Sequence, residues 1–126
     1  MSDQVIEIFD SLPRLIMRQP SLLRRAAAAQ AVLLLEAGQA SVRMHLSGGK
    51  LDIQPMDGPM QGWHVALRAA PAAWLDHWQS VPAPDAFDIF GMARRGRMRI
   101  EGDFTPLMRH LQVIKDILAL PRAHQS

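Results

Sequence analysis

The stretch Phe90–Leu120, FGMARRGRMRIEGDFTPLMRHLQVIKDILAL, carries the clearest structural pattern in this 126-residue chain. Its middle, Arg97–Glu101, alternates charged and apolar residues, which is typical of a strand with one buried face. Gly102 ends that strand, and Asp103 has the side chain and the position of a helix N-cap. Beyond it, apolar residues recur every three or four positions, which predicts one long amphipathic closing helix.

Composition limits the class of protein. With 48% hydrophobic residues, the chain is expected to form one soluble globular domain. It has no cysteine, which excludes disulfides, a thiolate nucleophile and a cysteine-ligated zinc site. It has no long apolar run and begins without the pattern of a secretory signal, so we expect a cytoplasmic protein. A net charge of +2 and the absence of tyrosine give little support for nucleic-acid binding.

The first third of the chain is predicted to be helical. Residues 3–18 show a helix-like apolar pattern that Pro13 interrupts, and the alanine-rich residues 22–30 predict a second helix. We expect residues 1–21 to form an apolar arm. Its pattern leaves open whether the arm packs on its own domain or on a partner subunit.

Four strand-like runs follow, at residues 32–35, 41–47, 51–54 and 63–68. The first is continuously apolar, which favours burial on both faces, while the others alternate apolar and polar residues. Gly48-Gly49 predicts a tight hairpin turn, and residues 55–62 predict a loop. Together these runs predict an antiparallel meander with one apolar face.

Two short helices are predicted next, at residues 71–78 and 85–93, before the final strand and helix. The order of elements predicts an α+β fold. In it, a five-stranded, mostly antiparallel sheet is covered on one face by helices. Periodicity alone favours a closed apolar core between the two layers.

One segment resembles a known family. Met92–Asp103 is similar to the signature G-x-(L/M)-x-(I/V)-x-G-D of the sterol carrier protein 2 family. The matching residues are Gly96, Met98, Ile100, Gly102 and Asp103. The order of the helices and strands in residues 22–120 also follows that family. The segment Gln79–Phe87 departs from it, because it replaces a short acidic step into the next helix.

The resemblance implies a domain at residues 22–122, with the arm at 1–21 before it and a short tail at 123–126 after it. It implies an apolar tunnel between sheet and helices that binds a fatty acyl chain, a lipid or an isoprenoid-type molecule. It also implies no catalysis and no cofactor. We expect eight residues to line the tunnel: Met44, Leu46, Trp74, Trp78, Phe90, Met98, Leu111 and Ile114. The departure at Gln79–Phe87 affects the expected shape of the tunnel mouth.

Two other functions are considered. The first alternative is a scaffold or accessory subunit that assembles with lipid- or quinone-metabolising enzymes, with the arm mediating assembly or a homodimer. The second alternative is a small hydrolase or isomerase, although no G-x-S-x-G motif supplies a nucleophile.

Two groups of polar residues have functional and purely structural interpretations. Arg94 and Arg95 belong to an arginine-rich segment that also contains Arg97 and Arg99. This segment forms either a solvated surface or a contact with anionic lipid headgroups or an acidic partner. His45 and His64 can meet across strands, but no third ligand is placed beside them. We therefore expect no metal site.

Overall fold

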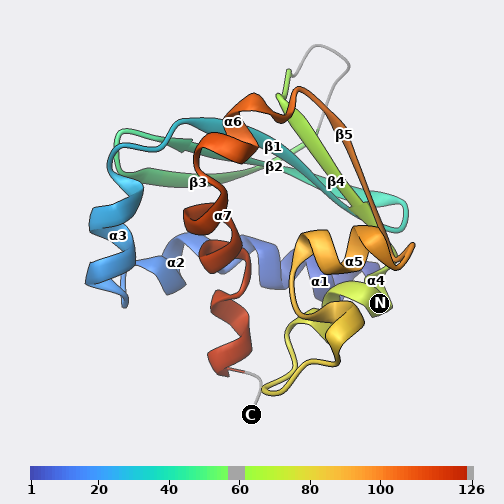
Figure 1. The fold of residues 1–126 in the computed structure, drawn as a ribbon. Coiled ribbons are helices and arrows are strands. Elements are labelled where there is room, and N and C mark those ends of the chain that lie inside the picture. Colours follow the sequence, from blue (N-terminus) through green and yellow to red (C-terminus); the bar gives the residue numbers. More distant parts are fainter. Residues whose placement is uncertain (57–61, 125–126) are drawn as a thin grey trace.

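The computed structural model describes residues 1–56 and 62–124. Most of the loop predicted at residues 55–62, and the last two residues of the predicted tail, lie outside the described residues. The described residues contain one five-stranded sheet with strand order β3-β2-β1-β4-β5 (Figure 1). Its strands are β1 (Ala31–Ala37), β2 (Ala40–Ser47), β3 (Lys50–Pro55), β4 (Val65–Ala69) and β5 (Met98–Gly102).

The central strand is β1, the most apolar of the five. Leu33 and Leu35 point into the core, and Leu34, on the opposite face, is also buried. A strand that is apolar on both faces needs neighbours on both sides, and β2 and β4 supply them. The prediction that this run is buried on both faces is therefore confirmed.

The predicted antiparallel meander is wrong at β4. This strand pairs with β1 in parallel, with Leu33 opposite Val65 and Leu35 opposite Leu67, instead of following β3 at the edge. The parallel pairing gives the apolar β1 a second apolar neighbour, which alternation along the sequence does not reveal. The other three adjacent pairs are antiparallel, so the mostly antiparallel sheet is confirmed.

The turn between β2 and β3 agrees with the sequence. Ser47 pairs with Lys50 across a two-residue connection, Gly48-Gly49, and both glycines have positive φ angles. Such angles strain any residue with a Cβ atom, so two consecutive glycines fit this turn.

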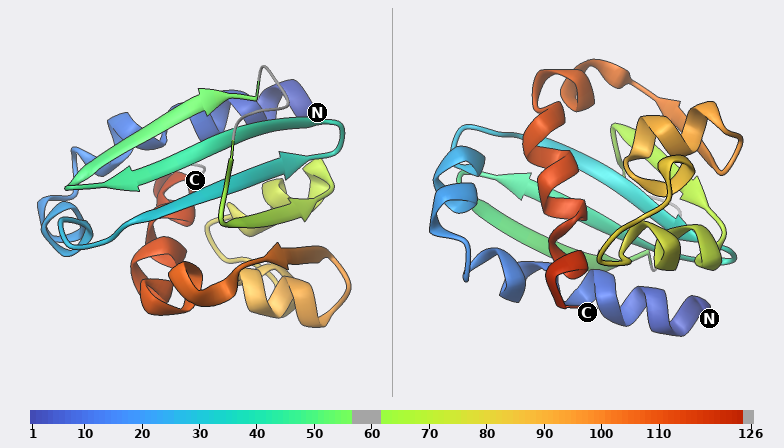
Figure 2. Two further views of the ribbon diagram at one scale, coloured as in Figure 1. Left: turned by 90° about the horizontal axis from the view of Figure 1, so that it is seen from above. Right: turned by 60° about the horizontal axis from the view of Figure 1, so that its bottom comes forward.

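The helices lie on one side of the sheet, with α6 beside the end of β5 (Figures 1 and 2). They are α1 (Ser2–Asp10), α2 (Leu12–Ile16), α3 (Pro20–Ala26), α4 (Pro71–His77), α5 (Ile89–Arg94), α6 (Phe104–Arg109) and α7 (Leu111–Leu118), with 3-10 turns at η1 (Pro84–Ala86) and η2 (Leu120–His124). The α+β class and the helical cover are confirmed.

Three predicted helices differ in extent. The closing helix is broken at His110, whose φ of −120° lies outside the helical region. As a result, α6 packs against β4, whereas α7 packs against α2 and α3. The helix predicted at 85–93 is a 3-10 turn followed by α5, because the Asp88 carboxylate accepts a hydrogen bond from the Gly91 N–H and caps the helix there. The helix predicted at 22–30 ends at Ala26, since the chain must extend before it enters β1.

The N-terminal residues pack on their own chain. Val5, Phe9, Leu12 and Ile16 are buried in the same core cluster as the inner face of the sheet. Pro13 lies in the first turn of α2, where its missing N–H removes no helical hydrogen bond. The division of the chain into an arm, a domain and a tail stays a prediction.

Candidate functional site

The candidate site is the apolar layer between the inner face of the sheet and the helices, here called the interior layer. All eight residues predicted to line a tunnel contribute to this one cluster. Six are buried, namely Met44, Leu46, Trp74, Trp78, Met98 and Ile114, while Phe90 and Leu111 are partly exposed at its boundary. The structure thus brings the predicted residues together. Their contact with a ligand stays a prediction.

An aromatic group fills the interior layer near α1 and α4. Phe9 meets Trp74 and Trp78 edge to face, with ring centroids 4.9 Å and 5.5 Å apart. The indole N–H of Trp78 donates to the Leu118 carbonyl at 2.8 Å. These edge-to-face contacts and the buried hydrogen bond make this end of the layer a closely packed aromatic wall. The sequence patterns did not identify Phe9 as part of it.

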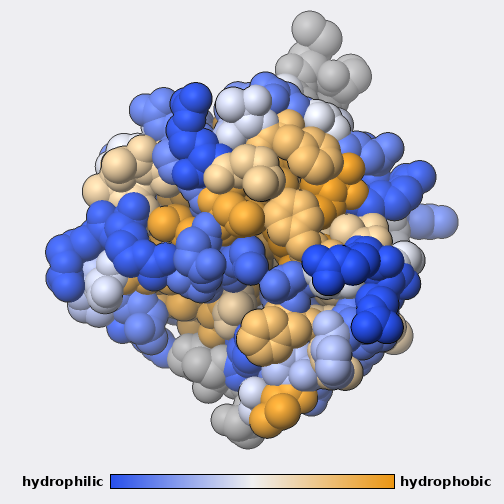
Figure 3. All heavy atoms as spheres, in the orientation of Figure 1, coloured by the Kyte–Doolittle hydropathy of each residue, from blue (hydrophilic) through white to orange (hydrophobic). Residues whose placement is uncertain are grey.

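At another boundary, the interior layer reaches the surface. Phe90 on α5, Ile100 on β5 and Leu111 on α7 are partly exposed and pack against the core. On α6, Phe104 and Met108 are more exposed, at 39% and 55%. We call these five residues the apolar strip. Figure 3 shows apolar side chains gathered over α6, the start of α7 and the neighbouring part of β5.

Sequence reasoning found Phe90 and Leu111 but missed the other three members of the strip. Alternation predicts that Ile100 lies with Met98 on one face of the sheet, and the spacing from Phe104 onward predicts that Phe104 and Met108 belong to the apolar stripe of a single helix. The break at His110 turns α6, and Met108 becomes exposed while Leu107 stays buried. No pattern in the sequence marks that break.

The turn at Gly102 and Asp103 sets where α6 begins. Gly102 has a φ of +114°, and a Cβ atom there would lie 2.5 Å from the carbonyl oxygen of His64. The Asp103 N–H donates to that same carbonyl at 2.8 Å, and its carboxylate accepts a hydrogen bond from the Thr105 N–H at 2.9 Å. The hydrogen bonds from Thr105 hold the pKa of Asp103 below its usual value. The predicted N-cap is confirmed.

A polar cleft of about 340 Å³ lies where α5, α7 and η2 meet. Buried His77 borders it, and its Nδ1–H donates to the Ala86 carbonyl at 2.8 Å. Lys115 pairs with Asp88 at 3.1 Å, and Arg122 donates to the carbonyls of His77 and Phe87. These contacts tie α4, α5, α7 and η2 together on the side away from the sheet.

Burial lowers the pKa of His77 from 6.5 to about 4, in spite of the hydrogen bond to Ala86. In the folded protein the His77 imidazole is therefore neutral down to about pH 4. In the unfolded chain the same imidazole takes up a proton below about pH 6.5, which favours unfolding. Stability from this group is present above that pH and is lost as the pH falls toward the folded pKa. We expect the free energy of unfolding to fall by about 2 kcal/mol between about pH 7 and about pH 4.5.

Urea unfolding across that pH range measures this effect. His77→Gln, which cannot be protonated, is expected to flatten the dependence even where it lowers stability at neutral pH. An unchanged slope in His77→Gln would show that other groups produce the pH dependence.

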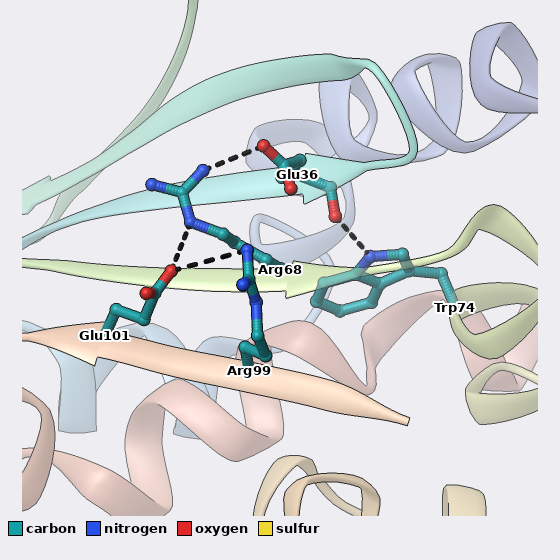
Figure 4. Close-up of polar contacts among 5 residues, drawn as sticks. All are labelled: Glu36, Arg68, Trp74, Arg99 and Glu101. Atoms are coloured by element: carbon teal, nitrogen blue, oxygen red, sulfur yellow. Dashed lines mark hydrogen bonds and ion pairs between the residues drawn. The ribbon is translucent and has the colours of Figure 1, made fainter. Parts of the chain in front are cut away.

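The opposite face of the sheet is polar. Arg68 on β4 pairs with Glu36 at 2.8 Å and with Glu101 at 2.6 Å, while Arg99 lies 3.8 Å from Glu101 (Figure 4). From the other side, the Trp74 indole N–H donates to the Glu36 carbonyl at 2.9 Å. Partly exposed ion pairs contribute little to stability, but they make this face unsuitable for an apolar ligand.

Arg94 and Arg95 lie at the end of α5, exposed and away from the interior layer. Their contact with a membrane or partner stays a prediction. Among the residues described, no group of three or more His, Asp or Glu side chains is placed to hold a metal ion. His64 instead accepts a hydrogen bond from the Val32 N–H. None of the helices described has the length and apolar character needed to cross a membrane.

Comparison with known proteins identifies the fold. No protein-family model and no curated protein matches the chain. A solved structure described as UbiJ-SCP2 ubiquinone synthesis protein matches with a TM-score of 0.62 and 16% identity, covering 98% of this chain and 95% of that chain. A crystal structure of sterol carrier protein 2 matches with a TM-score of 0.67 and 14% identity, covering 89% and 91% of the two chains.

The sterol carrier protein domain 2 of Helicoverpa armigera also matches, with a TM-score of 0.60 and 11% identity, over 92% of this chain and 86% of that chain. These matches include most of the strands and helices described above, in the same arrangement. The fold that the segment around Gly102 and Asp103 predicted is therefore confirmed: this chain has the sterol carrier protein 2 fold.

Proposed function

We propose that this protein binds and carries a hydrophobic ligand in the interior layer and catalyses no reaction on it. The ligand is a fatty acyl chain, a lipid or an isoprenoid-type molecule. The main support is the apolar strip, in which Phe104 and Met108 are exposed while Phe90, Ile100 and Leu111 are partly exposed and pack against the core. Such a cluster of exposed apolar side chains beside the core is what a ligand-binding opening requires.

The composition of the layer suits a ligand that displaces side chains. Met44, Met92 and Met98 are buried there, and methionine adapts its shape more readily than branched side chains. Burying eight to ten methylene groups contributes about 6–8 kcal/mol before the cost of association, at about 0.8 kcal/mol each.

Leu111→Trp is expected to weaken the binding of a fluorescent fatty acid to delipidated protein by about tenfold or more, because a bulkier side chain at the boundary obstructs the path inward. Leu111 is only partly buried, so the free energy of unfolding should change less than the binding free energy does. Fluorescence titration and urea unfolding of the same sample measure both.

Leu23→Trp is the matched control. Leu23 is also a partly buried leucine that packs against the core, but it lies on α3, away from the apolar strip. We expect it to leave binding nearly unchanged. Equal losses in both variants, or no saturable binding by the unmodified protein, would contradict the proposal.

A second candidate is an accessory subunit that assembles with lipid- or quinone-metabolising enzymes. It is supported by the similarity to the structure described as UbiJ-SCP2 ubiquinone synthesis protein, which extends over 98% of this chain.

Removing the first helices is a poor test of this candidate, because Val5 and Phe9 belong to the core. Met17 is 66% exposed at the end of α2, so Met17→Asp tests assembly without disturbing the core. Loss of a homodimer or complex in Met17→Asp, with fatty-acid binding intact, would favour this candidate.

A further inference from the structure

Some side chains of the arginine-rich segment are ion-paired with described residues, and others are not. Arg97 pairs with Asp76 at 2.8 Å and with Asp85 at 3.5 Å. Arg94 and Arg95 are exposed and have no ion pair with any described residue. The structure therefore leaves two adjacent, uncompensated positive charges at the end of α5.

These charges share a face with the apolar strip. The segment β5 connects them, with Arg94 and Arg95 before its start and α6 after its end. At about 3.3 Å per residue, the five residues of β5 span only about 15 Å, and Arg94 follows Phe90 of the strip by four residues, on the same side of α5. On α6, Phe104 and Met108 are four residues apart and therefore on one side of the helix, with exposed Arg109 next to them. In Figure 3, hydrophilic side chains border the apolar area on this face.

Most acidic groups on these elements and next to them are already paired. Asp88 pairs with Lys115, Asp116 with Arg25, and Glu101 with Arg68. Asp103 is exposed, but its carboxylate caps α6 through the Thr105 N–H. The face formed by α5, β5 and α6 thus combines exposed apolar side chains with an excess of positive charge.

We propose that this face docks on an anionic lipid surface. Phe104 and Met108 enter the boundary between headgroups and acyl chains, while Arg94, Arg95 and Arg109 contact the negative headgroups. The inference rests on the proposed function, because a hydrophobic ligand has a very low free concentration in water and must be exchanged with a lipid phase. Docking here places the outer end of the apolar strip against that phase.

Sedimentation with vesicles tests the charge. The full chain is expected to bind vesicles that contain phosphatidylglycerol, and to bind pure phosphatidylcholine vesicles far more weakly. The double substitution Arg94→Glu and Arg95→Glu should reduce the binding by at least about 30-fold, because each basic residue near an anionic surface contributes about a fivefold factor. High salt should weaken the binding of the unmodified protein in the same direction.

The double substitution Arg14→Glu and Arg18→Glu is the matched control. It makes the same change in net charge at exposed positions on and just after α2, which lies on another side of the molecule (Figure 2). It should retain most of the binding. Equal losses in the two double variants would overturn the proposal, because they would show an effect of net charge alone.

The apolar contribution has its own pair of variants. Met108→Ser is expected to lower vesicle binding several-fold, whereas Met17→Ser, at a methionine of similar exposure outside this face, should not.

Fatty-acid binding measured without vesicles separates this inference from the proposed function. A protein that binds the fatty acid but not phosphatidylglycerol vesicles overturns the docking proposal alone. Vesicle binding without fatty-acid binding overturns the proposed function.

Discussion

Trp74→Ala is expected to lower the free energy of unfolding by about 3–5 kcal/mol, the range observed when a buried tryptophan is truncated to alanine. Trp74 has no exposed surface, it packs edge to face on Phe9, and its indole N–H satisfies the Glu36 carbonyl at the end of β1. Truncation leaves a cavity between α1, α4 and the sheet and removes that donor. Urea unfolding followed by circular dichroism measures the loss without relying on tryptophan fluorescence.

Trp63→Ala is the control for this prediction. Trp63 is partly exposed and contacts the Arg68 guanidinium with 5.7 Å between that group and the ring centroid. A cation–π contact of this kind contributes about 0.5–1 kcal/mol, so the expected loss is small. If Trp74→Ala cost no more than Trp63→Ala, the aromatic wall of the interior layer would not exist as described.

Gly102→Ala is expected to destabilise the fold by more than about 3 kcal/mol, because backbone strain of about 1–3 kcal/mol adds to a steric clash. The added Cβ atom would lie 2.5 Å from the His64 carbonyl oxygen, and φ at this position is +114°. That carbonyl also accepts the hydrogen bond from the Asp103 N–H, so moving it disturbs the start of α6. Thermal and urea unfolding both report the loss.

Gly96→Ala separates the clash from the backbone strain. Gly96 also has a positive φ, at +77°, but a Cβ atom there would meet nothing within 4 Å. We expect a cost of about 1 kcal/mol, since only the unfavourable backbone conformation remains. Similar costs at Gly96 and Gly102 would show that the contact with His64 does not decide the turn.

Local features of the fold could be predicted because neighbouring residues determine them. The alternation in Arg97–Glu101 placed β5, the side chain of Asp103 placed the start of α6, and Gly48-Gly49 placed the hairpin. The continuous apolar run in β1 predicted a strand buried on both faces. Each of these depends on period, capping or turn geometry within a few residues.

Features that depend on distant contacts could not be predicted. The parallel pairing of β4 with β1 joins residues about thirty positions apart, and no local pattern encodes it. The contact of Phe9 with Trp74 places the N-terminal helix on its own domain, where the sequence left a partner subunit open. The break at His110 requires knowing what α6 and α7 each pack against.

In the candidate site, too, local patterns predicted some features and missed those that depend on distant contacts. Helical and strand periodicity identified apolar residues that the structure does gather, among them Met44, Trp78 and Ile114. Periodicity does not distinguish a boundary residue from a core residue, so Phe104 and Met108 were missed. The charge of Arg97 was grouped with that of Arg94 and Arg95, although Asp76 and Asp85 neutralise it.

The most direct test of the central claim is native mass spectrometry of the purified full chain, followed by denaturation and lipid analysis of what is released. The proposed function predicts a mass above that of the protein alone and the release of a fatty acid, phospholipid or isoprenoid-type molecule. A mass equal to that of the bare chain, together with no saturable binding of a fluorescent fatty acid, would contradict it.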